Sequence, residues 1–144
     1  MKYRQIKNEE YKFEDGTIVS STDINGIITY ANKTFCEISG YDRDELIGSR
    51  HNIIRHPDVP NIIFYELWET ISHGKTWEGI LKNLRKDGRY YWIYTVITPV
   101  IENGITIGYT SVRRPVFDVE KRETAEKFHK LILERSDPIN IVSY

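Results

Sequence analysis

Several features are scarce in this sequence of 144 residues, and each scarcity excludes a class of protein. Cys36 is the single cysteine, so the chain cannot form an internal disulfide, as is typical of cytoplasmic proteins. CxxC and HExxH spacings are absent, which argues against a structural zinc site. No apolar run approaches the roughly 18 residues of a membrane span, and residues 1–10 lack the apolar core of a signal peptide. We therefore expect a cytoplasmic protein that does not insert directly into a membrane.

The charge balance excludes a second class. Twenty basic and 21 acidic side chains give a net charge of −1. A protein that binds nucleic acid through electrostatics would show a surplus or a stripe of basic residues, so we expect no nucleic-acid partner. The length suits one domain with a substantial core. Ten Tyr and three Trp are many for this size, and such flat side chains can line a pocket for a ring-shaped ligand.

The apolar pattern and the turn signals predict two strands, three short helices, three strands and a last helix. The strands are expected at 17–22, 27–30, 77–85, 90–101 and 105–113, and the helices at 32–39, from 42 onward, 61–73 and 118–135. Asn-Gly and Asp-Gly turns make the last three strands a meander. This order is an α+β architecture, with a five-stranded antiparallel sheet, short helices on one face and a C-terminal helix.

Three segments follow from this organisation. Residues 1–14 are polar and are expected to form a mobile or partner-docking arm. Residues 15–116 form the domain itself. Residues 117–144 form a C-terminal helix and a tail. The charged part of that helix, 118–135, is either a dimer element that resembles a coiled coil or a surface helix, because its apolar residues are too sparse to establish a heptad.

The stretch RHPD at residues 55–58 is the densest group of polar residues in the chain. Pro57 and Pro60 restrict the backbone around it. One interpretation is a solvated turn with an ion pair between Arg55 and Asp58. The other is one wall of a ligand pocket, in which Arg55 pairs with a phosphate as a fork while His56 and Asp58 bind the ligand or each other. The local residues alone leave both interpretations open.

Longer phrases resemble a known family. The element order, TDINGIITYAN at 22–32, FCEISGY at 35–41 and ELIG at 45–48 resemble a PAS sensor domain over residues 17–115. A more specific resemblance, to the PAS domains of bacterial aerotaxis receptors, rests on the RHPD stretch, WEG at 77–79 and RKDG at 85–88, together with further single residues. These single residues are His51, Asn52, Trp68, Asn83, Tyr91 and Trp92.

That resemblance implies a non-covalently bound flavin, FAD rather than FMN, whose redox state is sensed. It ties positions matching Arg55, His56, Asp58 and Trp77 to FAD. Asn83 is a candidate for the polar edge of the flavin because its amide both donates and accepts, and Tyr91 for stacking or ribityl contacts. Other candidates have a plainer interpretation. His51 either supports a ligand-binding residue without touching the ligand or is structural. Asn32 either caps a helix or contacts the adenine end of FAD. Trp68 is a core residue on a helix face.

The chain is similar to stand-alone energy-taxis proteins of the CetB type. This resemblance implies a homodimer and a membrane-bound chemoreceptor signalling protein as partner, met at the inner face of the membrane. No nucleophile–base pair stands out, so we expect no enzyme. Photosensory LOV domains need a reactive Cys that is missing from the region 53–58. A haem sensor needs an axial His on a helix that faces the pocket, whereas His51 and His56 lie near a proline-rich turn, so haem is the less favoured alternative. The main alternative is a cofactor-free PAS module that only binds other proteins.

Overall fold

The computed structural model describes residues 5–135. Its elements follow the order that the sequence predicts, with one addition, a short 3-10 helix before the RHPD stretch. The elements are β1 (Ile18–Asp23), β2 (Ile28–Ala31), α1 (Lys33–Ser39), α2 (Arg43–Leu46), the 3-10 helix η1 (His51–Ile54), α3 (Asn61–Ser72), β3 (Trp77–Leu84), β4 (Tyr90–Glu102), β5 (Ile105–Arg114) and α4 (Val119–Glu134). The predicted tail, 136–144, lies outside the described residues.

Capping residues explain where the first two helices begin and end. The Asn32 side chain accepts a hydrogen bond from the backbone N–H of Phe35 at 3.0 Å, which confirms it as the N-cap of α1. Gly40 ends α1 at a φ of 79°, a conformation that glycine adopts without strain. Asp42 and Glu45 form the reciprocal capping box that begins α2.

The five strands form one antiparallel sheet in the order β2-β1-β5-β4-β3. The consecutive strands β3, β4 and β5 form the predicted meander. Strand β1 pairs with β5, which places the first two strands of the chain beside the last one. The pairing of β3 with β4 stops at Ile97, so at Pro99 β4 has only β5 as a neighbour. Proline lacks the N–H that a second neighbour requires, which explains its position.

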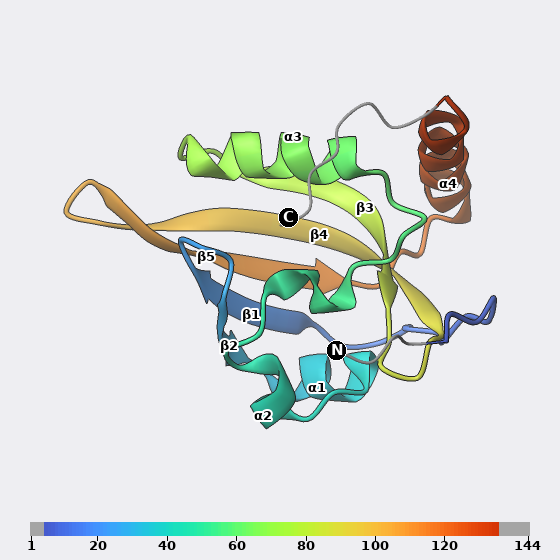
Figure 1. Cartoon of the computed structure of the whole chain (residues 1–144), viewed down its shortest axis with the longest axis horizontal. Coiled ribbons are helices and arrows are strands. Elements are labelled where there is room, and N and C mark those ends of the chain that lie inside the picture. Colours follow the sequence, from blue (N-terminus) through green and yellow to red (C-terminus); the bar gives the residue numbers. More distant parts are fainter. Residues whose placement is uncertain (1–4, 136–144) are drawn as a thin grey trace.

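The helices divide between the two faces of this sheet. Figure 1 shows α3 running along β3 and β4, with α1 and α2 beside β1 and β2, and η1 between these two groups. The core lies between this helical layer and the inner face of the sheet, where Ile18, Phe35 and Ile93 are almost completely buried. In contrast, α4 stands apart, at the end of the molecule opposite the β4–β5 hairpin (Figure 1).

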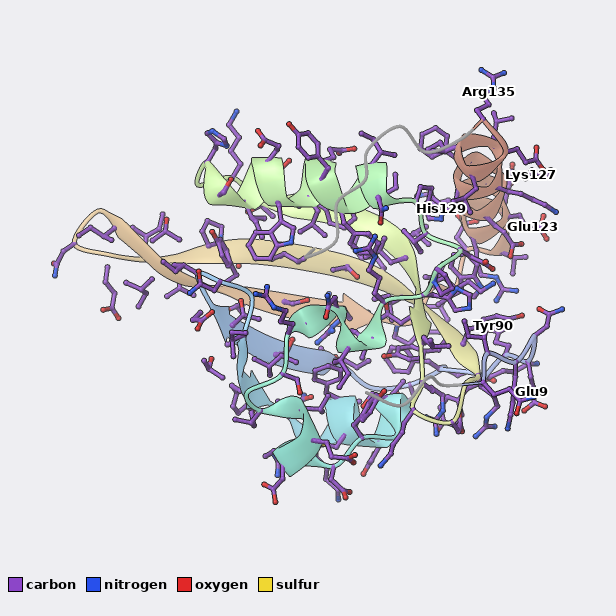
Figure 2. All side chains as sticks on the ribbon, in the orientation of Figure 1. Glu9, Tyr90, Glu123, Lys127, His129 and Arg135 are labelled. Atoms are coloured by element: carbon purple, nitrogen blue, oxygen red, sulfur yellow. The ribbon has the colours of Figure 1, made fainter. Side chains whose placement is uncertain are left out.

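Helix α4 covers part of the outer face of the sheet. Its residues share a surface pocket with Glu78, Ile80 and Tyr94, which alternate with the inward-facing positions of β3 and β4. His129 lies on the side of α4 that faces the domain, while Glu123 and Lys127 point away from it (Figure 2). The sequence did not reveal which face of this helix contacts the domain, because its buried face carries a histidine rather than a row of leucines.

Residues 5–14, part of the predicted mobile or partner-docking arm, lie against the domain in this structure. The backbone N–H groups of Lys7 and Tyr11 donate to the carbonyls of Gly88 and Tyr90, at 2.8 and 2.7 Å. Phe13 is buried in the core. This segment therefore pairs with the start of β4 instead of standing free, because its aromatic residues have apolar surface to cover.

Candidate functional site

A cavity of about 80 Å³ lies between the inner face of the sheet and the helical layer. Its walls come from the β1–β2 turn, η1, α3 and strands β3 to β5. Most of its lining is apolar, from residues that include Leu67, Ile71, Leu81, Ile93 and Ile97. The β alternation places side chains of three neighbouring strands on this one face, and α3 supplies the opposite wall. The result is an apolar slot in the position where a flat ligand would be enclosed.

A buried polar group forms the base of the cavity. The Arg113 side chain, on β5, donates to Ser20 Oγ on β1 and lies 3.2 Å from His51 Nε2 on η1. His51 Nε2 is also 3.0 Å from Ser20 Oγ. The Phe35 ring stacks on the His51 ring, with centroids 6.0 Å apart, and lies 4.3 Å beneath the Arg113 guanidinium. This group ties β1, β5, α1 and η1 together.

Of the side chains in this group, Arg113 alone carries a charge at physiological pH. Burial, together with the charge of Arg113, lowers the pKa of His51 to about 3, so the imidazole is neutral at physiological pH. Burial lowers the pKa of Arg113 to about 10, so its guanidinium keeps the charge. Arg113 is 1% exposed, and among the described residues its hydrogen-bond partners are the neutral Ser20 and His51.

Three buried polar atoms in the cavity lining have no hydrogen-bond partner within the described residues: Thr95 Oγ1, Ser111 Oγ and Arg113 Nε. Thr95 lies directly across from Arg113 in the pairing of β4 with β5, and Ser111 is two residues before Arg113 on β5. An orphaned buried polar atom costs stability unless a ligand or water satisfies it. The inner face therefore offers hydrogen-bonding capacity to a polar edge of a ligand.

Arg55 and Asn83 meet at the edge of the cavity. Their backbones form an isolated antiparallel bridge, and both side chains line the cavity. The Arg55 guanidinium lies 4.3 Å from the centroid of the Phe64 ring. The Asn83 amide lies 3.5 Å from the hydroxyl of Tyr91, and burial raises the pKa of Tyr91.

The rest of the RHPD stretch turns away from the cavity lining. His56 is 3% exposed, accepts a hydrogen bond from the backbone N–H of Asp58 at 3.0 Å and packs edge-on against Tyr90. Asp58 forms an ion pair of 2.9 Å with Lys82. Burial raises the pKa of Asp58, but the hydrogen bond and charge of Lys82 outweigh it, so the net shift is downward. These two residues anchor the stretch on the outer side of β3, and a direct role at a ligand stays a prediction.

The other candidates have separate places. Trp68 lines the cavity and packs edge-to-face on Tyr109, with centroids 5.4 Å apart. Trp77 is buried outside the lining, and its indole N–H donates to Glu66 on α3 at 3.4 Å. Asn32 also lies outside the lining, and its amide is used by the scaffold. The structure thus brings together Arg55, His51, Asn83 and Trp68 at the cavity and leaves Asn32, His56, Asp58, Trp77 and Tyr91 outside its lining.

Sequence reasoning missed the polar residues of the inner face. Arg113, Ser111 and Thr95 sit in strands whose ends were identified correctly, but their side chains were taken as ordinary strand residues. A signal was present, because Tyr109, Ser111 and Arg113 alternate on one face of β5. A charged residue in phase with a buried tyrosine indicates a buried charge, and hence a candidate site.

The residues fit a flavin in chemistry, and the fit requires movement. An apolar slot suits the ring system, the orphaned polar atoms suit its polar edge, and Arg55 suits a phosphate. At about 80 Å³ the cavity is too small for a tricyclic ring, so lining side chains must shift. Of the lining residues, Arg55, Phe64 and Trp68 are partly exposed and are the candidates for this movement.

Within residues 5–135, no three His, Cys, Asp or Glu side chains gather as a metal site would require. Among the described helices, none combines the length and the apolar character that a bilayer crossing needs.

Comparisons with known proteins agree with this architecture. The family described as PAS fold matches residues 28–113. The aerotaxis receptor of Escherichia coli is 43% identical over 107 residues, which are 74% of this chain and 21% of the receptor. The chain thus spans about a fifth of the length of that relative.

Solved structures share the fold. A PAS domain from Colwellia psychrerythraea has a TM-score of 0.64 and 27% identity, covering 69% of this chain and 86% of that one. A light-oxygen-voltage domain, whose mechanism was studied with a flavin analogue, has a TM-score of 0.65 and 22% identity, covering 83% of this chain and 87% of that one. The strand order, the helical layer and the match over residues 28–113 lead to one conclusion: the chain belongs to the PAS-fold family.

Proposed function

We propose that the chain is a flavin-binding redox sensor for energy taxis, with FAD as its cofactor. The observation that carries this proposal is the cavity, which is apolar around its walls and has three unsatisfied polar atoms at its base. The similarity to the aerotaxis receptor supports the sensory role. When bound, FAD supplies reversible redox chemistry, while the protein supplies position, enclosure and electrostatics.

A second pocket supports FAD over FMN. A surface pocket of about 430 Å³ adjoins the cavity, and Arg55 and Asn52 line both spaces. A dinucleotide needs room beyond the ring, and the pyrophosphate in its middle needs a cation. Arg55 stands at the boundary with a fork-shaped guanidinium that matches a phosphate. FMN would need the inner cavity and Arg55, but not the outer pocket.

The outer pocket also connects the proposed flavin site to helix α4, through which the sensor could signal to a partner. Leu133 of α4 lines it, together with residues of the RHPD loop and the start of α3. The same helix exposes Phe128 and Leu131, which are 53% and 48% exposed. We expect a change at the ligand to alter how α4 lies on the domain, and a membrane-bound chemoreceptor signalling protein to read that change at its apolar residues. Such a signal requires two states with different affinity for the partner.

Residues outside the cavity lining have positioning roles in this proposal. The ion pair of Asp58 with Lys82 holds the RHPD loop against β3. The backbone bridge between Arg55 and Asn83 holds Arg55, in the same loop, at the edge of the cavity. Trp77 joins β3 to α3 through Glu66. A change at Asp58 or Trp77 should therefore weaken cofactor retention by displacing a wall of the cavity.

The test is direct. The purified chain, as isolated or after incubation with FAD, should show flavin absorption that dithionite bleaches, and mass spectrometry of the released cofactor should identify FAD. Arg55→Gln should weaken retention of FAD, because it removes the guanidinium that would pair with a phosphate. Arg114→Gln is the matched control, because Arg114 is exposed on the opposite side of β5. A protein that is colourless and takes up no added flavin would contradict the proposal and favour a cofactor-free interaction module.

A further inference from the structure

The Arg113 side chain is a buried cation whose charge has no obvious counterpart. It is 1% exposed and lines the cavity. Within residues 5–135 the structure pairs it with no carboxylate, and its partners are the hydroxyl of Ser20, the neutral ring of His51 and the face of Phe35. Buried charges in proteins are normally paired, because an unpaired one is costly. Contact with the face of the Phe35 ring offsets only part of the cost of burying this charge.

The unsatisfied groups around Arg113 are all able to donate. Arg113 Nε–H has no acceptor, and the hydroxyls of Ser111 and Thr95 have no partner among the described residues. All three residues are at least nine-tenths buried and belong to the same cavity lining. Thr95 stands opposite Arg113 in the β4–β5 register. A cation flanked by free hydroxyls is a site for an electron-rich or negatively charged group.

His51 cannot provide this counter-charge itself. Its Nε2 faces Arg113 and Ser20, and its ring is stacked on Phe35. Two further arginines line the cavity, the exposed Arg50 and the partly buried Arg55. Arg55 is bridged to β3 and its guanidinium lies over Phe64 at the boundary with the outer pocket. Arg113 thus lies at the base of the cavity, and Arg55 lies at its boundary with the outer pocket.

We propose that Arg113, with Ser111 and Thr95, binds the edge of the flavin ring that becomes negative on reduction, so the chain binds the reduced flavin more tightly than the oxidised one. This inference rests on the proposed flavin binding. Reduction by a two-electron donor, such as a reduced nicotinamide, adds two electrons and one proton to the neutral ring. The proton bonds to N5, one negative charge stays near N1, and the donor is oxidised. No bond to the protein forms or breaks.

The physical reason is differential binding. The oxidised ring is neutral and gains only hydrogen bonds from this group, whereas the reduced ring gains the charge of Arg113 in a site shielded from water. A site that favours the reduced form raises the reduction potential of the bound cofactor. Arg113 would therefore set the redox level at which the sensor switches, and Arg55 would set how firmly the cofactor is held.

The test compares two neighbouring arginines. Arg113→Gln and Arg114→Gln each remove one positive charge from the end of β5, one on the cavity side and one exposed. The affinity of each variant for oxidised FAD and, under anaerobic conditions, for dithionite-reduced FAD is measured, together with the midpoint potential. We expect Arg113→Gln to weaken binding of reduced FAD at least tenfold more than binding of oxidised FAD. This corresponds to a potential lower by about 30 mV for a two-electron couple. Arg114→Gln should leave the ratio unchanged.

Further variants keep the test decisive if Arg113→Gln does not fold. Arg113→Lys keeps the charge and should keep most of the preference for reduced FAD. Thr95→Val removes a hydroxyl that has no partner in the described structure, so the variant should fold and lose part of the preference. Equal affinity losses for the two redox states, or an unchanged ratio in Thr95→Val, would overturn the inference. Failure of the unmodified chain to bind either form would instead overturn the proposed function.

Discussion

The environment of the partly buried His51 predicts a specific dependence of stability on pH. In the unfolded chain a histidine has a pKa near 6.5, whereas in the fold the pKa of His51 is about 3. Below pH 6.5 the unfolded chain therefore takes up a proton that the folded chain refuses. The stabilisation is fully present above pH 6.5 and is lost as the pH falls toward 3. Each pH unit in this window costs about 1.4 kcal/mol, so a change from about pH 7.5 to about pH 5 should cost roughly 2 kcal/mol.

Urea unfolding of the wild type and of His51→Gln, at both pH values and the same cofactor loading, isolates this effect. The variant should lose about 2 kcal/mol less between the two pH values than the wild type does. The pKa of His129 is also lowered, by burial and by Lys82, and its contribution has the same sign but is common to both proteins. His73→Gln is the control, because His73 is exposed. Equal pH dependence in the wild type and His51→Gln would refute the reasoning.

Three further predictions concern the scaffold, each measured as a free energy of unfolding in urea. Asn32→Ala should cost about 2 kcal/mol or more, because the amide serves two backbone N–H groups and one carbonyl, and a cost below about 0.5 kcal/mol would contradict this role. Gly79→Ala should cost about 1–3 kcal/mol, since a Cβ there would lie 2.5 Å from the Trp77 ring, and a neutral result would contradict that packing. Asp58→Asn should cost about 1–3 kcal/mol by leaving Lys82 without its carboxylate, whereas Lys82→Met should cost less, and the reverse order would contradict the ion-pair argument.

The sequence was sufficient to predict the elements because their signals are local. Capping side chains such as Asn32, turn glycines and the alternation of apolar residues each act within a few positions. They therefore predicted the strands and the main helices to within one or two residues. The short η1 helix was missed, since its four residues carry no cap or periodicity of their own.

The site was only partly predictable because its residues come together through the sheet register. The RHPD stretch was treated as one unit, yet Arg55 lies in an extended bridge to Asn83, and successive side chains of an extended segment point to opposite sides. Arg55 therefore lines the cavity while His56 does not. Arg113 was missed because its burial depends on β1 lying next to β5, a pairing between residues that are about 90 positions apart in the chain.

The ion pair of Lys82 with Asp58 gains meaning beside Arg113. Both cations are buried on the same sheet, Lys82 on its outer face and Arg113 on its inner face. Lys82 is balanced by a carboxylate, whereas Arg113 has none among the described residues. Of these two buried cations, only the one on the cavity side lacks a compensating negative charge among the described residues. A negative charge that entered the cavity would remove this imbalance, so binding of an anionic ligand would even out the charge on the two faces of the sheet.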